Sequence, residues 1–207
     1  SLVKAEVIID KLTRKRNSFS GLDMSSLHLM GIINLTPDSF YEKSKKNNVL
    51  SALEAANKMN NEGASIVDIG GESSRPGALK LSPDEEKNRV LSSIIAIKKE
   101  ELKAKLSLDT RNLSTMEIGY KNGIDIINDI SGFIDNKNIN FISKASLPII
   151  VMHMQNNPTT MQENPQYEFA PIDIYKILSK RIQTLLSLGV KESNIVIDPG
   201  IGFGKNL

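Results

Sequence analysis

Six apolar segments of the sequence each end in polar side chains, and these are the residues best suited to chemistry. The polar residues at the six ends are Asn34, Glu72 with Ser74 and Arg75, Asp109, Asn128, His153 and Asp198. In parallel α/β folds, ligands bind beyond the carboxyl ends of the strands. Any one of these residues taken alone is better explained as a helix cap or a turn residue. Because all six segments end in this way, the pattern favours one shared binding site.

The segment 194–205 shows the pattern most clearly. Its apolar residues run into Asp198, and Pro199 biases Asp198 towards an extended conformation. Alternating glycines follow, with Phe203 and Lys205 among them. Because glycine has no side chain, such a loop lets the backbone approach a ligand closely. The segment has the format of an active-site position on an α/β barrel.

The residue types restrict the reaction that such a site performs. The sequence has no cysteine, which excludes thiolate nucleophiles and cysteine-ligated zinc. It has only 2 histidines. It contains no Gly-x-Ser-x-Gly, His-Glu-x-x-His or P-loop pattern, and its glycine spacing differs from the dinucleotide fingerprint. The remaining carboxylates and amides suit a flat, nitrogen-rich heterocycle, because Asp accepts from ring N–H groups while Asn both donates and accepts. Chemistry there depends on positioning and electrostatics and not on a protein nucleophile.

The elements that must position these side chains alternate along the chain. We predict strands over residues 27–34, 65–69, 105–108, 124–127, 149–152 and 195–197. Helices between them begin near residues 48, 82, 113, 139 and 174. The strands are continuous apolar runs, which indicates a parallel sheet covered by crossover helices. The pattern fits an open doubly wound sheet, or an eight-stranded barrel that lacks its last two units.

Composition limits the class of protein. The 207 residues, 40% hydrophobic and 24% charged, suffice for one globular domain with a substantial core. A net charge of +2 gives no electrostatic argument for a nucleic acid or a membrane surface as partner. No apolar run approaches membrane-spanning length, and the N-terminus lacks the apolar region of a signal peptide. The absence of cysteine suits the cytosol, so we expect a cytoplasmic protein.

Six segments resemble the motifs of the dihydropteroate synthase family and occur in the family's order. They are residues 30–40, 68–77, 107–110, 127–130, 152–155 and 198–205, and the resemblance covers about residues 28–207. It implies a parallel (β/α)8 TIM barrel, with about six of the eight β/α units present. It also implies an N-terminal arm or linker over 1–27, followed by a C-terminally incomplete pterin-binding barrel domain over 28–207.

The resemblance implies a transferase of folate biosynthesis. The family joins 6-hydroxymethyl-7,8-dihydropterin diphosphate to 4-aminobenzoate, giving dihydropteroate and pyrophosphate. The expected cofactor is Mg²⁺, and the expected partners are the two small-molecule substrates, with a homodimer in the full-length enzyme. Loss of pyrophosphate leaves a pterin cation that the aromatic amine attacks, and Mg²⁺ neutralises charge on the leaving group.

The same resemblance assigns roles to individual residues. Asp109, Asn128 and Asp198 bind the pterin ring, with Met152 and Ile130 lining its slot. Asn34 is the magnesium-linked residue, and with Asp109 and Asp198 it completes the catalytic group. The other expected substrate contacts are Ser74 at the diphosphate, Phe40, Arg75, Pro76 and Phe203 around the aminobenzoate, and Gly202.

The sequence also departs from the family pattern. After Phe40 the family usually has Ser-Asp-Gly-Gly, where this chain has Tyr-Glu-Lys-Ser, and the family's later Ser-Arg-Lys and Arg-x-His motifs are absent. We interpret Arg111, where lysine is commoner, as a neutral surface exchange, and Asp68 as a satisfied structural carboxylate.

Two other functions stay open at this point. One is a methyltetrahydrofolate methyltransferase-like pterin barrel, against which the Thr-Pro-Asp-Ser-Phe and Glu-Ser-Ser-Arg-Pro loops count. The other is a truncated chain that binds pterin without turnover. A cobalamin requirement distinguishes the first of these alternatives, and downstream coding sequence distinguishes the second.

Overall fold

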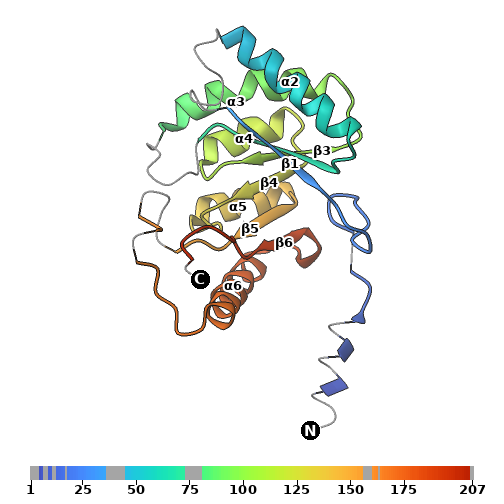
Figure 1. The fold of residues 1–207 in the computed structure, drawn as a ribbon. Helices are drawn as coiled ribbons and strands as arrows, with labels where there is room; N and C mark the ends of the chain where they lie inside the picture. Colours follow the sequence, from blue (N-terminus) through green and yellow to red (C-terminus); the bar gives the residue numbers. More distant parts are fainter. Residues whose placement is uncertain are drawn as a thin grey trace.

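The computed structural model describes residues 5–6, 9–10, 13–16, 18–35, 45–72, 81–155, 160–162 and 164–205. In this part of the chain, strands and helices alternate as the sequence predicts (Figure 1). The strands are β1 (Met30–Asn34), β2 (Ile66–Gly70), β3 (Lys105–Asp109), β4 (Ile126–Asp129), β5 (Ile149–Met152) and β6 (Ile195–Asp198). The helices are α2 (Lys45–Asn61), α3 (Pro83–Lys98), α4 (Leu113–Lys121), α5 (Asn136–Ala145) and α6 (Ala170–Ser187), with a 3₁₀ turn η2 (Glu192–Asn194).

The strand order decides between the two architectures left open by the sequence. All neighbours pair in parallel, in the order β1-β2-β3-β4-β5-β6. A doubly wound sheet reverses its direction of growth at a switch point, whereas a barrel adds each strand beside the previous one. The described residues therefore form a partial TIM barrel, with β1 and β6 as the two edges of a sheet that is not closed. No helix among them is long and apolar enough to cross a membrane.

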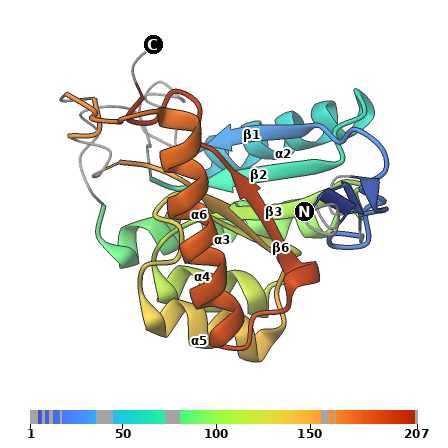
Figure 2. The same ribbon diagram turned by 90° about the horizontal axis from the view of Figure 1, so that it is seen from below.

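The helices cover the outer side of the strands. Helix α2 packs on α3, α3 on α4 and α4 on α5, in the order of the strands they follow (Figure 2). The main core lies between the two layers and joins strand residues such as Val67 and Leu108 to helix residues such as Ile94 and Ile142. This packing explains why the strands are apolar without interruption.

The starts of α3 and α6 differ in how closely they match the sequence prediction. Before α3, Ser82 and Glu85 form the expected capping box, with Glu85 N donating to Ser82 Oγ at 3.3 Å. Helix α6 begins at Ala170, four residues before the predicted start, because Pro171 occupies its first turn. The apolar spacing of this helix begins only at Ile174, so periodicity alone places its start too late.

A second, smaller core lies inside the sheet, at the amino ends of the strands. Ile66, Ile126 and Ile150 point inwards there and pack with Phe19, which is 3% exposed. Phe19 and Leu22 exchange backbone hydrogen bonds of 3.0 and 2.8 Å, forming a tight turn. The last residues of the predicted arm thus close the bottom of the sheet's interior, and polar side chains occupy the opposite, carboxyl end.

Candidate active site

Strand alternation aims the polar side chains into the interior of the sheet. Successive residues of a strand face opposite sides, so Asp68 and Asp109 point inwards while Ile69 and Leu108 join the outer core. The register aligns Asp109 with Gly70 on one side and Asn128 on the other. Asp109 and Asn128 therefore lie at one level near the carboxyl ends of their strands, and Asp68 lies two residues lower on β2, beside Ser107.

Gly70 creates space between two of the expected site residues. A Cβ atom at Gly70 would lie 3.4 Å from Asp109 Oδ2 and 3.6 Å from Asn34 Oδ1. An amide oxygen and a carboxylate oxygen thus border the same space, from β1 and β3. Within the described residues, the Asn34 side chain makes no hydrogen bond, so its oxygen remains available to a ligand.

Asp68 orients the amide of Asn128. Asn128 Nδ2 donates to Asp68 Oδ2 at 3.0 Å, and Asp68 is only 3% exposed. Burial raises the pKa of Asp68 above its ordinary value, and hydrogen bonding with Ser107 and then Asn128 opposes that shift. The interpretation of Asp68 as a satisfied structural carboxylate holds for Oδ2, which accepts the Asn128 hydrogen bond, while Oδ1 is buried on the side of Ser107.

Asp109 stands in a strongly acidic environment. Burial, followed by the charges of Asp68, Asp129, Glu86 and Glu72, raises the pKa of Asp109 well above its ordinary value. A ligand that donates N–H groups or develops positive charge relieves this repulsion. The site is therefore suited electrostatically to a ligand of that kind.

Arg111 is part of the site's framework and not of its surface, so the sequence interpretation of this residue is wrong. Its Nε and Nη2 donate to the two carboxylate oxygens of Glu72 at 3.0 and 2.8 Å. The two side chains are 23% and 14% exposed. Glu72 Oε1 also accepts from the backbone N–H of Leu81 at 3.2 Å. The pair joins the loop after β3 to the loop after β2.

Asp129 builds the turn that carries Ile130. Its carboxylate accepts from Ser131 N at 2.8 Å, Ser131 Oγ at 2.6 Å and Phe133 N at 3.1 Å. Burial raises the pKa of Asp129, and these hydrogen bonds oppose the shift. A Cβ at Gly132 would lie 2.9 Å from the carbonyl oxygen of Met152, so this turn packs directly on β5. Ile130 and Met152 are thereby brought to the same end of the sheet.

The glycine-rich loop after β6 is held against β5. Asp198 Oδ1 accepts from Gly200 N at 2.7 Å, and a Cβ at Gly200 would collide with the carbonyl of His153. Lys205 Nζ donates to the carbonyls of Phe203 at 2.8 Å and His153 at 3.2 Å, and lies 3.1 Å from His153 Nδ1. Burial, then the Lys205 charge, lowers the pKa of His153. The loop's path is fixed by these contacts.

Comparison with known proteins agrees with this geometry. A family model described as pterin binding enzyme matches residues 30–207. The chain belongs to the pterin-binding enzyme family. It is 39% identical over 188 residues to the dihydropteroate synthase of Escherichia coli (strain K12). The matched region covers 91% of this chain and 66% of that relative. It therefore spans about two thirds of that relative's length.

Solved structures of the pterin-binding family share the fold. The Yersinia pestis dihydropteroate synthase with a sulfonamide drug complex superposes with a TM-score of 0.82 and 37% identity, covering 89% of this chain and 67% of that one. The Xanthomonas albilineans enzyme with 4-aminobenzoic acid gives a TM-score of 0.84 and 31% identity, covering 94% and 69%. The expected barrel architecture is confirmed.

The expected pterin-site residues gather at one end of the sheet. Asn34, Asp109, Met152 and Asp198 are the last residues of their strands, and Asn128 is the last but one of β4. Ile130, Gly202 and Phe203 lie in the loops that follow, while Phe40, Ser74, Arg75 and Pro76 fall outside the described residues.

Three residues to which the sequence assigned no role support the loops around the site. Asp129, Glu86 and Lys205 each hold a loop beside the site. Only Asp129 carried a readable signal, since an aspartate followed by Ser-Gly favours a turn closed by its own side chain.

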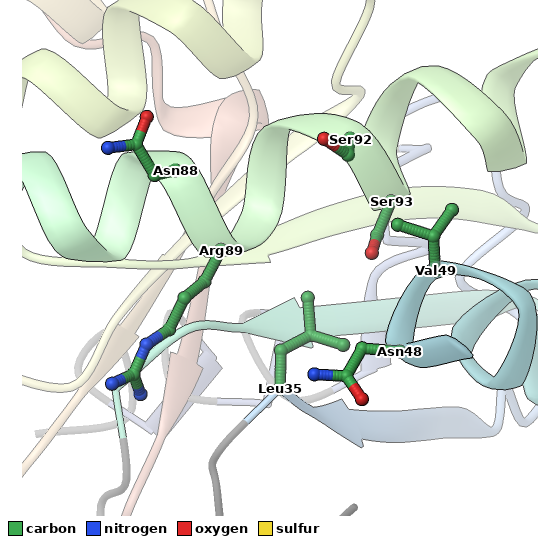
Figure 3. Close-up of a pocket in the computed structure, with 7 residues that line it drawn as sticks. All are labelled: Leu35, Asn48, Val49, Asn88, Arg89, Ser92 and Ser93. Atoms are coloured by element: carbon green, nitrogen blue, oxygen red, sulfur yellow. The ribbon is translucent and has the colours of Figure 1, made fainter. Parts of the chain in front are cut away.

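A cavity elsewhere in the described residues does not belong to the site. It has a volume of about 230 Å³ and lies between α2 and α3 (Figure 3). It is lined by Leu35, Asn48, Val49, Asn88, Arg89, Ser92 and Ser93. Leu35 joins the outer core, on the opposite face from Asn34, so this cavity lies in the helix layer.

Proposed function

We propose that this chain carries the pterin site of a dihydropteroate synthase. The reaction joins 4-aminobenzoate to 6-hydroxymethyl-7,8-dihydropterin diphosphate and releases pyrophosphate. The observation that carries the proposal is the convergence of Asp109, Asn128 and Asp198 at the carboxyl end of a partial barrel of this family. Similarity to an enzyme solved with 4-aminobenzoic acid supports the second substrate.

The pterin ring binds between the interior acids and the apolar edge. Asp109 accepts hydrogen bonds from ring N–H groups, and Asn128 supplies its remaining N–H and its oxygen. The Asp68 contact orients that amide before the ligand arrives. Met152 and Ile130 cover the faces of the ring, and Asp198 closes the pocket from β6.

The transfer step requires charge stabilisation and no protein nucleophile. The bond between the methylene carbon and the diphosphate oxygen breaks, and pyrophosphate leaves with the electron pair. The amine nitrogen of 4-aminobenzoate then bonds to that carbon and loses a proton. The carboxylates of Asp109 and Asp198 favour the cationic pterin electrostatically. Phe203 and Gly202 shape the aminobenzoate side, together with Phe40, Arg75, Pro76 and, at the diphosphate, Ser74.

The residues present fit Mg²⁺ bound mainly through substrate. The described residues contain no cluster of three His, Cys, Asp or Glu that could hold a metal ion. Mg²⁺ commonly uses one or two protein ligands together with waters and substrate phosphates, so a single amide oxygen is compatible. Asn34 Oδ1, which faces the space over Gly70, is the ligand we assign. When bound, the ion neutralises charge on the departing pyrophosphate.

The organisation of the chain follows from the same proposal. We assign residues 1–27 to an N-terminal arm and 28–207 to the barrel domain, because Phe19 packs on the interior residues of the sheet. A homodimer of the full-length protein and a cytoplasmic location complete the proposal, as expected for an enzyme of small soluble substrates.

Calorimetry of the 207-residue chain with the pterin diphosphate and Mg²⁺ tests the pterin site, and a dihydropteroate assay with 4-aminobenzoate tests turnover. We expect saturable pterin binding that Asp198→Asn weakens. Failure of the folded chain to bind the pterin would overturn the proposal. Binding without turnover would support the pterin site and assign catalysis to a longer chain.

A further inference from the structure

Glu86 is a buried carboxyl that the proposed reaction does not use. It lies in the first turn of α3 and its exposed fraction is 0%. One oxygen, Oε2, accepts from Thr110 Oγ1 at 2.9 Å, Asn112 Nδ2 at 2.9 Å and Thr115 Oγ1 at 2.6 Å. The other oxygen, Oε1, is buried without a partner among the described residues. A buried charge held only by neutral donors is costly, so its retention calls for a reason beyond packing.

The three donors belong to the segment that directly follows Asp109. Thr110 is the next residue, and its backbone N–H donates to the Asn128 carbonyl at 2.9 Å. Asn112 precedes α4 at the N-cap position, but its side chain makes no capping bond because its amide is directed to Glu86. Thr115 lies in the first turn of α4. Glu86 Oε2 on α3 therefore holds the segment from the end of β3 to the first turn of α4 through three hydrogen bonds.

The end of β2 packs on the same residue. A Cβ at Gly71 would lie 3.0 Å from Glu86 Cγ and 3.2 Å from its carbonyl oxygen. One turn later on α3, Arg89 Nη1 donates to the Gly71 carbonyl at 3.3 Å. Glu86 therefore packs between the carboxyl ends of β2 and β3, next to the loops that begin with Gly71 and Thr110.

We propose that Glu86 is a positioning residue of the pterin site, which fixes the loop after β3 through one oxygen and sets the charge behind Asp109. The inference rests on the proposed function. Four acids face Asp109: Asp68 and Glu72 from β2 and its loop, Asp129 from β4, and Glu86 from α3. Arg111 is the neighbouring cation, and it is paired with Glu72.

The two roles of Glu86 predict separable effects. Its hydrogen bonds hold the backbone next to Asp109, so their loss displaces the carboxylate that the pterin contacts. Its charge, after burial, is among the causes that raise the pKa of Asp109. If only that charge is removed, Asp109 ionises at lower pH and pterin binding persists to lower pH.

Glu86→Gln separates charge from hydrogen bonding. The amide oxygen can replace Oε2 as acceptor for all three donors, and the amide nitrogen takes the place of the unpartnered Oε1. Glu86→Ala removes both roles. The matched control is Glu85→Gln, the same change at the exposed neighbouring residue, where an amide also completes a capping box. Thr115→Val removes the shortest of the three hydrogen bonds and leaves the charge in place.

The experiment measures calorimetric affinity for 6-hydroxymethyl-7,8-dihydropterin diphosphate between about pH 5 and 9, with thermal melting to confirm folding. The ligand's own titration is common to all variants and cancels in the comparison. We expect Glu86→Ala to weaken binding about 10–100-fold, as loss of an outer supporting residue commonly does. We expect Glu86→Gln to move the acid limb of the profile to lower pH, and Glu85→Gln to match the wild type.

Each outcome is decisive for one of the two proposals. Failure of the wild type to bind contradicts the proposed function. Wild-type binding with a Glu86→Gln profile that coincides with it contradicts the charge role. If Glu86→Gln does not fold, Thr115→Val decides the anchoring role: weaker binding with an unmoved acid limb supports it, and unchanged affinity overturns it.

Discussion

Replacing Asp109 by asparagine removes one charge from the acidic interior and changes little in volume. Asp109 is half-buried, borders the space over Gly70 and faces four other carboxyls. A hydrogen bond to a charged group contributes about 1.5–3 kcal/mol. Since each 1.4 kcal/mol is tenfold in affinity, Asp109→Asn is expected to weaken pterin binding by about 10–150-fold.

The same substitution is expected to stabilise the fold at neutral pH. The pKa of Asp109 is raised in the folded state above its unfolded value of about 3.9. Its protonated form therefore contributes stability that is present below the unfolded pKa and is lost as pH rises through the folded pKa. The amide introduced by Asp109→Asn never ionises, so the variant escapes this loss. We expect a gain of about 0.5–2 kcal/mol at pH 7, as is common when a functional strain is removed.

Urea denaturation at several pH values and calorimetry with the pterin diphosphate test both parts. The matched control is Asp135→Asn, at an exposed N-cap where either residue accepts the helix N–H. The stability gain of Asp109→Asn should vanish towards about pH 4 and below. Unchanged affinity, or a variant less stable than wild type at neutral pH, would refute the reasoning, provided that Asp135→Asn behaves as wild type.

Three further substitutions test the framework around the site. Arg111→Lys keeps the charge but loses the bidentate pair, so denaturation should show a loss of about 1 kcal/mol; equal stability would restore the surface interpretation. Phe19→Ala should destabilise by about 3–5 kcal/mol, since Phe19 is 3% exposed, whereas Phe169→Ala, at 63% exposure, should have little effect. Lys205→Met removes one cause of the lowered pKa of His153, so NMR titration should show that pKa rise; an unmoved titration would contradict the contact.

The alternation of strands and helices could be predicted because each signal is local. A parallel strand buried on both faces is an apolar run, and its polar last residue stands out against that run. Asp109 and Asp198 could be found in this way, and the structure places both at strand ends. Caps such as Ser82 were readable for the same reason, since their partners lie three residues away.

The supporting residues could not be predicted because their partners are distant in sequence. Glu86 follows Asp84 and Glu85 in an acidic run that looks like the exposed first turn of a helix. Its burial depends on donors more than twenty residues later, beginning at Thr110. Arg111 was misread because its partner, Glu72, lies 39 residues earlier. Neither pairing leaves a periodic pattern in the chain.

The acidic interior is unfavourable to folding and useful to the proposed reaction for the same physical reason. Asp68, Asp109 and Asp129 lie on three adjacent strands, and burial raises the pKa of each. The neutral donors to Asp68 and Asp129, such as Asn128, orient these two carboxylates but do not cancel their charge. A pterin that becomes cationic as pyrophosphate leaves supplies the missing positive charge only at that stage. The repulsion stored in the free site is therefore relieved most in the transition state, which is the condition for an interaction to accelerate the step and not merely to tighten binding.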